Sequence, residues 1–521
     1  MALQAWVPVE EKLFAADSSG AVQEIAAADL QALQPEAVIL FDYKKLLKKY
    51  PELSTVAPGK IFDVKLAAYV LDPADNFDSA KSCIEKLLPE CSVDSYAAEA
   101  ESLLKLGTLL REKLGDDRIY YTLELPLSPV LAAMEQNGIA IDKEQLSEFG
   151  KTIAGELAET EKTVFDLAGK NFNINSPKQL GELLFETLKL PVVGKKTKSG
   201  YSTDAETLEK LAGLHPAVPQ ILKYRKLSKV NSTYVEGLLK YIQSDGKVHT
   251  TFNMTATATG RLSSVEPNLQ NIPVAGDLGG EIRKFIHPAP GKIFIDADYS
   301  QIELRILAHM ADDPVMIDAF KNHQDIHTAT ACLIFGVAPE TVTPEMRRKA
   351  KAVNFGIVYG ISSFTLANDL AVTKAEAQEY INKYFEKYSA VKSYLDRSIE
   401  KAKTLGYAET LFGRKRFLPE LKSKNFAVRS FGERVALNMP IQGTAADLIK
   451  MAMIKVHNAL AEACPGAELL LQVHDELLIS APEHQAEKAS ELLRSTMENV
   501  FEFKVPLEVS TAAGKTYFDV K

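Results

Sequence analysis

The chain has 521 residues, of which 46% are hydrophobic and 25% charged, and its formal net charge at pH 7 is −9. This composition is ordinary for a soluble globular protein of roughly two to four domains. No apolar stretch of about 18 residues and no leader-like N-terminus is present, which argues against membrane insertion and secretion. The negative charge disfavours nucleic acid as a partner only weakly, because such binding depends on local fields. The four cysteines lack paired metal spacing, so we expect reduced thiols and no zinc site.

The first predicted region, residues 1 to about 117, alternates short apolar runs with helical stretches. Residues 37–41 (Ala-Val-Ile-Leu-Phe) form one such run. The alternation is typical of an α/β domain, and we expect this region to fold separately from the rest.

A helix-rich segment follows at residues 146 to about 245, with Lys and Glu on alternating faces. Within it, residues 223–229 form a basic run that leads into Asn231 and Ser232. Charge runs usually mark solvated faces, and contact with a phosphate backbone is the alternative.

Two acidic stretches lie next to predicted strands. An apolar run at residues 292–295 predicts a strand that ends before Asp298, while residues 469–480 predict a hairpin with Asp475 and Glu476 at its bend. Two carboxylates from distant segments are the expected minimum for a pair of divalent metal ions in phosphoryl transfer, so we nominate Asp298 and Asp475. Glu476 would point to the other face of an extended strand, which weakens its metal role. The alternative is that each acid only accepts backbone N–H groups at a turn.

Between these stretches, residues 343–360 predict a helix that Thr343 caps and Gly360 ends. Side chains spaced four residues apart form one slanted stripe along it, namely Arg347, Lys351, Phe355 and Tyr359. Two cations followed by two aromatics match the order of a triphosphate and its nucleoside, because Arg and Lys are the usual partners of phosphate oxygens. A solvated basic helix end followed by core aromatics would give the same stripe.

Three motifs thus stand in order along the chain: Asp-Tyr-Ser-Gln-Ile-Glu-Leu-Arg at 298–305, Arg-Arg-x-x-Lys-x-x-x-Phe-Gly-x-x-Tyr-Gly at 347–360, and Val-His-Asp-Glu at 473–476. Thr-Gly-Arg-Leu-Ser-Ser at 259–264, Asp-Ile-His-Thr at 325–328 and Pro-Ile-Gln-Gly-Thr-Ala-Ala-Asp at 440–447 accompany them. Together they resemble the motifs of family A DNA polymerases, the bacterial DNA polymerase I group. The resemblance covers roughly residues 118–521, and the motif sequences are most similar to those of the large fragments of Bacillus-type enzymes.

The resemblance implies an α/β (α+β) fold of the right-hand polymerase type, preceded by a ribonuclease H-like 3′-5′ exonuclease-type domain. The implied boundaries are residues 1–117 for the exonuclease-like domain and 118–521 for the polymerase domain. Within the polymerase domain, the thumb takes about 146–245, the fingers about 317–405, and the palm about 246–316 and 406–521.

The resemblance also implies roles for individual residues. Metal ions would be held by Asp298, Asp475 and the backbone carbonyl of Tyr299, and the catalytic set would further include Glu476 and Lys351, a candidate proton donor to pyrophosphate. The nucleotide would contact Arg347, Lys351, Phe355, Tyr359, His327, Glu303 and Gln301, with Glu303 excluding a 2′-hydroxyl by its bulk. DNA would contact Arg261, Asn268, Gln270, Arg434, Asn438, Gln442, His474, Lys229, Asn231 and Ser232, of which Arg261, Asn438 and Gln442 would reach the minor groove.

These roles imply template-directed, primer-dependent DNA synthesis in the 5′-to-3′ direction, in replication or repair, with release of pyrophosphate. The expected cofactor is a pair of Mg²⁺ ions, for which Mn²⁺ can substitute, and the expected partners are primer-template DNA and deoxynucleoside triphosphates. A cytoplasmic, nucleoid-associated monomer that does not engage a membrane is the expected setting. Three alternatives stay open: a phage-type RNA polymerase, which would not need Glu303 as a gate, reverse transcriptase activity on RNA templates, and a primer-template binding protein without catalysis.

The exonuclease-like region departs from the family pattern. No Asp-x-Glu precedes Trp6, and Ala100 stands where proofreading members carry Asp. Because that chemistry requires about four carboxylates around two metal ions, we expect no proofreading, and we interpret Asp42 as an ordinary surface acid. Ala275 stands where the family commonly has Arg, so strand displacement or nucleotide affinity is expected to differ. The family's 5′-nuclease domain has no counterpart here, as expected of a large fragment or a naturally short enzyme.

Overall fold

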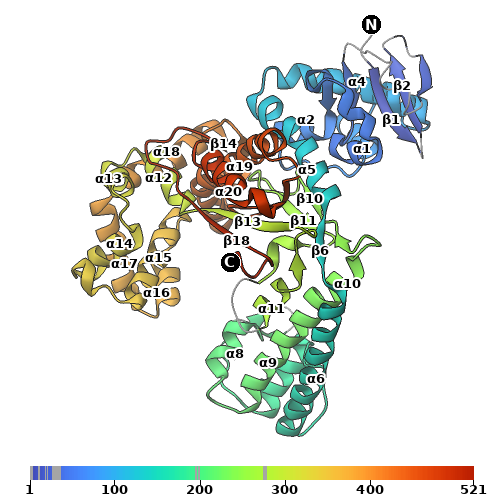
Figure 1. Ribbon diagram of the computed structural model, residues 1–521. Coiled ribbons are helices and arrows are strands. Elements are labelled where there is room, and N and C mark those ends of the chain that lie inside the picture. Colours follow the sequence, from blue (N-terminus) through green and yellow to red (C-terminus); the bar gives the residue numbers. More distant parts are fainter. Residues whose placement is uncertain are drawn as a thin grey trace. The chain divides into compact units, whose positions relative to one another are not determined.

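The computed structural model describes residues 4–9, 12–17, 19, 21–25, 37–193, 196–197, 200–273 and 278–521. Helices and strands alternate along the chain, so the expected mixture of α and β structure is confirmed (Figure 1). The chain divides into two compact units. The first unit comprises Met1–Asn137, Phe252–Ser264 and Ile295–Ala512, and the second comprises Gly138–Thr251, Val265–Phe294 and Ala513–Lys521. The boundaries of palm, fingers, thumb and exonuclease-like domain remain predictions.

The first unit begins with a five-stranded sheet in the order β3-β2-β1-β4-β5, in which β4 runs parallel to both β1 and β5. Its strands are β1 (Gln4–Val9), β2 (Lys12–Asp17), β3 (Val22–Ile25), β4 (Val38–Leu40) and β5 (Ile61–Asp63). The helices that follow are α1 (Tyr43–Lys49), α2 (Val64–Leu71), α3 (Ala80–Leu87) and α4 (Tyr96–Leu114). Strand β4 is the predicted apolar run, and all three of its residues are buried. The α/β pattern predicted for this region is therefore confirmed.

A second sheet of the first unit carries both acidic motifs, in the order β16-β17-β13-β18. Its strands are β13 (Lys292–Tyr299), β16 (Glu468–Val473), β17 (Glu476–Pro482) and β18 (Val509–Gly514), and the packed helices include α5 (Leu125–Asn137), α12 (Ile302–Ala311), α19 (Phe426–Ala463) and α20 (Ala486–Glu498). The predicted hairpin is confirmed, since β16 and β17 pair antiparallel with Val473 opposite Glu476. The strand predicted at 292–295 runs on to Tyr299, because β17 and β18 flank it on both sides. Asp298 is therefore inside this strand and not beyond its end.

A group of helices lies between α12 and α19 in the sequence. They are α13 (Pro314–Lys321), α14 (Ile326–Phe335), α15 (Pro344–Val358), α16 (Ser363–Leu370), α17 (Lys374–Lys387) and α18 (Ser389–Leu405), followed by the hairpin of β14 (Tyr407–Glu409) and β15 (Lys415–Phe417). The predicted helix at 343–360 is confirmed as α15. The Thr343 hydroxyl accepts the backbone N–H of Met346 at 3.2 Å, and Gly360, with φ of 65°, follows the helix end.

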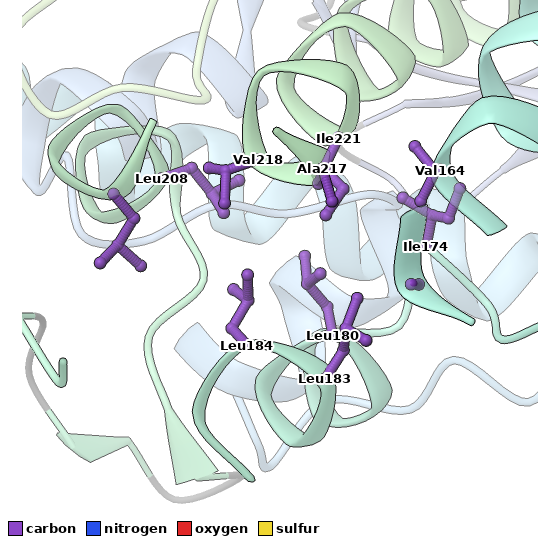
Figure 2. Packing of buried hydrophobic residues seen from close by; sticks show 11 residues of the cluster. Val164, Ile174, Leu180, Leu183, Leu184, Leu208, Ala217, Val218 and Ile221 are labelled. Carbon is purple, nitrogen blue, oxygen red and sulfur yellow. The ribbon is translucent and has the colours of Figure 1, made fainter. Parts of the chain in front are cut away.

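The second unit is mainly helical. It contains α6 (Lys143–Ala168), α7 (Pro177–Gly181), α8 (Ala205–Leu211), α9 (Ala217–Lys229), α10 (Gly237–Tyr241), α11 (Gly279–Arg283) and a three-stranded sheet of β12 (Ile286–His287), β6 (Ile139–Ile141) and β9 (Lys247–Val248). The end of α6 packs with α7, α8 and α9 around Val164, Leu180, Leu183, Leu208 and Ile221, each fully buried (Figure 2). Burying each such side chain contributes roughly 1.5–3 kcal/mol. The helix-rich character predicted for residues 146–245 is confirmed.

Four charged side chains form a buried network within the first unit. The Lys450 ammonium lies 2.7 Å from Glu124 Oε1, the Arg414 guanidinium also contacts Glu124, and Arg414 Nε lies 2.7 Å from Asp447 Oδ1. Each of these side chains is at most 2% exposed. Burial alone would raise the pKa of the Glu124 carboxyl, but Lys450 and Arg414 hold it below its usual range. The network joins the segment before α5 to helix α19.

We predict that Glu124→Ala destabilises the protein by about 3–5 kcal/mol, because it leaves the fully buried Lys450 cation without its carboxylate. Urea unfolding followed by circular dichroism measures the change. The control is Glu345→Ala, which removes an exposed partner of Arg348 and should leave the unfolding midpoint unchanged. Equal midpoints for both variants would contradict the prediction.

Candidate active site

The fold brings the two nominated aspartates to adjacent strands. Asp298 is the next-to-last residue of β13, and Asp475 lies in the two-residue turn that joins β16 to β17. The backbone N–H of Tyr299 donates to the carbonyl of Asp475 at 3.3 Å, which ties the end of β13 to this turn. His474, in the same turn, has a left-handed φ of 54° and is exposed. Asp298 thus lies in a strand of this sheet, and Asp475 lies in the turn that joins two of its other strands.

The turn after β13 is held by a residue that the sequence motifs contained but to which we assigned no role. Arg305 on α12 is 4% exposed and donates to the carbonyls of Ser300 and Pro506 at 2.8 and 2.5 Å and to Glu508 at 2.5 Å. The Ser300 N–H in turn donates to the Glu508 carbonyl at 2.8 Å. Arg305 therefore fixes the backbone directly after the Asp298 position. The motif carried no signal of this, because Pro506 and Glu508 come from the distant segment that precedes β18.

Negative charge is concentrated around Asp475. Burial raises the pKa of the Asp475 carboxyl, and the neighbouring Glu303 and Glu476 raise it further, against the lowering effect of Arg261. A divalent cation at this point would relieve that repulsion. Among the described residues no group of three or more His, Cys, Asp or Glu side chains is arranged to hold a metal by itself. Two carboxylates with a backbone carbonyl are a fitting partial donor set for an ion that also binds substrate phosphates.

The Tyr299 side chain is not available for such a role. Its hydroxyl donates to the Met497 carbonyl at 2.8 Å, and the residue is 3% exposed. Any contribution of Tyr299 to a cation must therefore come from its backbone carbonyl, as the resemblance implies.

Glu303 connects the carboxylates to helix α15. Its Oε1 accepts from Arg261 Nη2 at 2.8 Å and its Oε2 accepts from the Tyr359 hydroxyl at 2.7 Å. The Tyr359 hydroxyl also bonds Gln442, and burial together with Glu303 raises the pKa of Tyr359 to about 12. Tyr359 thus remains a hydrogen-bond donor. The structure brings together residues that the sequence assigned to separate nucleotide and DNA groups.

The stripe on α15 faces two residues of helix α14. Arg347 Nε donates to Asp325 Oδ2 at 2.6 Å, and the Lys351 ammonium lies 5.9 Å from the centre of the Phe355 ring. That ring lies 5.9 Å from the ring of His327. Asp325 also caps α14 by accepting the His327 N–H at 3.1 Å. Asp325 belongs to a motif noted in the sequence, but its hydrogen bond to Arg347 was not predicted.

His327 is buried and neutral. Its Nδ1 accepts from Asn354 Nδ2 at 2.8 Å, and the residue is 3% exposed. Burial lowers the pKa of His327 to about 4, with Arg347 and Lys351 adding to the effect and Asp325 opposing it. At neutral pH the ring is therefore a hydrogen-bonding group and not a third cation. Asn354 is a further residue that we did not assign from the sequence.

Two cavities of the first unit include other predicted residues. One, of about 360 Å³, is lined by Gln301, Asp325, Arg347 and residues around Arg305. Another, of about 650 Å³, is lined by Phe355, Gly356 and Tyr359 near α15 and by Arg434 of α19. Asn438, one turn after Arg434, has a buried Oδ1 without a hydrogen-bond partner among the described residues. These positions are consistent with binding roles that remain predictions.

The remaining DNA-binding candidates belong to the second unit. Lys229 is exposed at the end of α9, Asn231 Nδ2 donates to Glu236 at 2.7 Å, and the Ser232 hydroxyl donates to the Ser228 carbonyl at 2.8 Å. Asn268 accepts the backbone N–H of Gln270 at 3.0 Å. These five residues are described within their own unit, and their predicted roles stay predictions. Ala275 lies outside the described residues.

Comparison with known proteins identifies the family. The model of DNA polymerase family A matches residues 143–519. The chain belongs to DNA polymerase family A. It is 46% identical over 495 residues to DNA polymerase I of Caldicellulosiruptor bescii, and 46% over 508 residues to that of Geobacillus stearothermophilus. These alignments cover 93% and 92% of this chain but 58% of each relative, so the chain spans a little over half the length of the curated relatives it matches.

A solved structure supports the same conclusion. The POL domain of Pol1 from M. smegmatis, in complex with DNA primer-template and dNTP, matches with a TM-score of 0.93 and 36% identity. The match covers 99% of this chain and 95% of that domain. The resemblance stated from the motifs is confirmed. Members of this family generally use divalent metal ions. Within the described ranges, no helix is long and apolar enough to cross a membrane.

We predict that His327 makes stability depend on pH between about 4 and 6.5. The folded pKa of about 4 lies below the ordinary value of 6.5, so the unfolded state binds a proton in this window that the folded state does not. Stability is therefore lost as the pH falls through the window. His327→Gln should show a shallower fall of the thermal midpoint than the parent, whereas exposed His484→Gln should follow the parent. Identical slopes for parent and His327→Gln would refute this account.

Proposed function

We propose that the chain is a DNA-directed DNA polymerase that extends a primer 3′ end with deoxynucleoside triphosphates and releases pyrophosphate. The observation that carries the proposal is that β13, the turn between β16 and β17, and helix α15 are connected by hydrogen bonds and charge within the first unit. The Tyr299–Asp475 backbone hydrogen bond brings the aspartates to adjacent strands, and Glu303, which adds to the negative field at Asp475, is hydrogen-bonded to Tyr359 at the end of α15. The M. smegmatis domain with the same fold is in complex with DNA primer-template and dNTP, which supports these partners here.

The metal proposed for this site is Mg²⁺, with Mn²⁺ as a substitute. Asp298, Asp475 and the Tyr299 carbonyl would hold two ions, which when bound supply Lewis-acid activation of the primer 3′-oxygen and neutralise charge on the phosphates. Oxygen donors suit this choice, since hard divalent cations prefer carboxylate and carbonyl ligands. Glu476, at the start of β17, contributes negative charge beside them.

The side chains of α15 and α14 would orient the nucleotide. Arg347 and Lys351 are exposed cations at one end of the stripe and suit the phosphate oxygens. Phe355 would pack on the sugar, with His327 donating to a phosphate and Lys351 protonating the departing pyrophosphate. Asp325 holds the Arg347 guanidinium in place before the nucleotide arrives. The contacts with the nucleotide would thus serve mainly to position its phosphates, which is the main requirement of phosphoryl transfer.

The remaining residues would follow the primer-template. Arg261 and Gln442 are donors suited to minor-groove acceptors that all correct base pairs share, with Asn438 beside them. Arg434 and His474 would line the path of the template and primer terminus, whereas Gln301, which lines a cavity with Arg347, would contact the nucleotide. In the second unit, Lys229, Asn231, Ser232, Asn268 and Gln270 would contact the DNA backbone.

We expect Asp298→Asn to reduce primer extension by at least about a thousandfold in Mg²⁺, because a neutral amide cannot hold the catalytic cations. The measurement is gel-resolved extension of a labelled primer, with primer-template affinity recorded separately. Asp318→Asn, an exposed position on α13, is the matched control and should extend normally. If the parent protein binds primer-template but does not extend the primer, the chain is a binding protein without catalysis and the proposal is wrong.

We expect Glu303→Ala to raise the ratio of ribonucleotide to deoxynucleotide incorporation by at least about tenfold, because it removes the bulk proposed to exclude a 2′-hydroxyl. The buried Glu303 also holds Arg261 and Tyr359, so deoxynucleotide use should fall at the same time. Single-nucleotide kinetics with both sugars measure the ratio. An unchanged ratio would remove Glu303 from the proposal, and ready use of ribonucleotides by the parent would favour an RNA polymerase.

We further propose that the N-terminal region does not proofread. Two of its carboxylates are engaged in local structure: Asp63 accepts backbone N–H groups of Asp42 and Tyr43 at 3.1 and 2.8 Å, and Asp42 caps α1 and lies 2.8 Å from the Lys65 ammonium. Asp42 is therefore a partly buried capping residue and not the ordinary surface acid that we expected. Ala100 is fully buried and offers no ligand.

A primer with a mismatched 3′ end should accordingly stay uncut in Mg²⁺ without nucleotides. Denaturing electrophoresis of the labelled primer over several hours tests this, with an Asp298→Asn sample to exclude reversal of synthesis. Shortening of the primer by both proteins would overturn the proposal.

A further inference from the structure

A chain of buried hydrogen bonds ends at the ring of His327. The Thr330 hydroxyl donates to Asn354 Oδ1 at 3.0 Å, and Asn354 Nδ2 donates to His327 Nδ1 at 2.8 Å. Thr330 and Asn354 are fully buried and His327 is 3% exposed. Tyr388, at the N-cap of α18, also hydrogen-bonds Thr330. The chain therefore links α18, α14 and α15 through side chains alone.

The direction of these bonds fixes the ring's protons. Because Thr330 donates to Oδ1, the Asn354 amide must direct its NH₂ toward His327. A nitrogen that accepts this bond carries no proton, so a neutral ring carries its proton on Nε2. Without Asn354, the ring could adopt either tautomer, and one of them would direct a lone pair at any anion beside Nε2.

We propose that Asn354 is a positioning residue that holds His327 as a neutral Nε2–H donor for the triphosphate of the incoming nucleotide. The inference rests on the proposed polymerase function. It assigns His327 a directional hydrogen bond, while the charge is supplied by Arg347 and Lys351 on the neighbouring helix. The low pKa of the His327 ring agrees with a hydrogen-bonding role for His327 and a charge-supplying role for Arg347 and Lys351.

The surroundings of the ring favour the neutral form. The charged groups that face it are Asp325 at the start of α14 and Arg347 and Lys351 on α15. Asp325 is already bonded to Arg347 at 2.6 Å, so it is only partly able to support a second cation. The Phe355 ring, 5.9 Å away, covers the imidazole from the side of α15. A fixed neutral donor avoids the repulsion that a third cation would meet.

The first test is spectroscopic and does not depend on catalysis. In parent protein with ¹⁵N-labelled histidine, two-bond ¹H–¹⁵N correlation spectra should show His327 with Nδ1 unprotonated and Nε2 protonated at neutral pH. His327→Gln identifies the signal among the nine histidines. A parent ring with a proton on Nδ1, or a doubly protonated ring, would overturn the proposal, whatever the enzyme's activity.

The second test uses Asn354→Asp, which keeps the shape and the bond from Thr330 but cannot donate. Nδ1 must then carry a proton, so kcat/KM for the nucleotide should fall about ten- to hundredfold at pH 8. The difference in kcat/KM between the variant and the parent should become smaller toward pH 6, because a second proton on the His327 ring restores the Nε2–H donor. Asn382→Asp, an exposed position on α17, controls for the added charge and should stay within about twofold of the parent.

The outcomes separate the two proposals. An equal loss for Asn354→Asp at every pH, with the ring's tautomer unchanged, would mean that Asn354 only supports packing. An inactive parent with the expected ring protonation would contradict the proposed function but leave the positioning of His327 standing. If Asn354→Asp fails to fold by circular dichroism, Thr330→Val replaces it, and its ring should show a mixture of tautomers.

Discussion

The candidate active site depends on the pairing of β13 with its neighbours in a four-stranded sheet. Strands from three distant parts of the sequence meet there, and the bond from the Tyr299 N–H to the Asp475 carbonyl closes the end of the arrangement. Backbone pairing of this kind positions carboxylates more rigidly than loops do. Arg305 stabilises the backbone after β13 by donating hydrogen bonds to Ser300, Pro506 and Glu508. The fold also holds Asp475 beside Glu303 and Glu476, although repulsion among these carboxylates opposes the arrangement.

Charge in the site is separated into two regions. Asp475 and Glu476, at the turn between β16 and β17, form a negative region with Glu303 of α12, and Arg347 and Lys351 form a positive region on α15. Glu303 belongs to the first region and yet bonds Tyr359 and Arg261. A substrate that is itself an anion with bound cations matches both regions.

Local sequence signals predicted much of this arrangement. The hairpin around Asp475 and the helix capped by Thr343 were read correctly, because both depend on apolar periodicity and on residues next to them in the chain. The length of β13 was underestimated, since its last four residues include Asp296 and Asp298, which interrupt the apolar run and are kept extended by the neighbouring strands. The partners Asp325–Arg347 and Asn354–His327 could not be predicted, because each joins two helices whose packing no local pattern encodes. Asp42 was misread for the same reason: its Lys65 partner belongs to another helix.

Two buried glutamates, Glu124 just before α5 and Glu135 within it, pair with lysines from distant parts of the first unit. Glu135 at the end of α5 is 1% exposed, accepts the Phe252 N–H at 2.8 Å and lies 2.6 Å from the Lys48 ammonium of α1. Together with Glu124 it supplies the anions for buried lysines on both sides. A shortened chain that began after residue 137 would leave Lys450 and the Phe252 amide stripped of acceptors. Residues 120–137, which carry both glutamates, are thus a foundation for α1 on one side and α19 on the other, and shortened versions of this chain have to retain them.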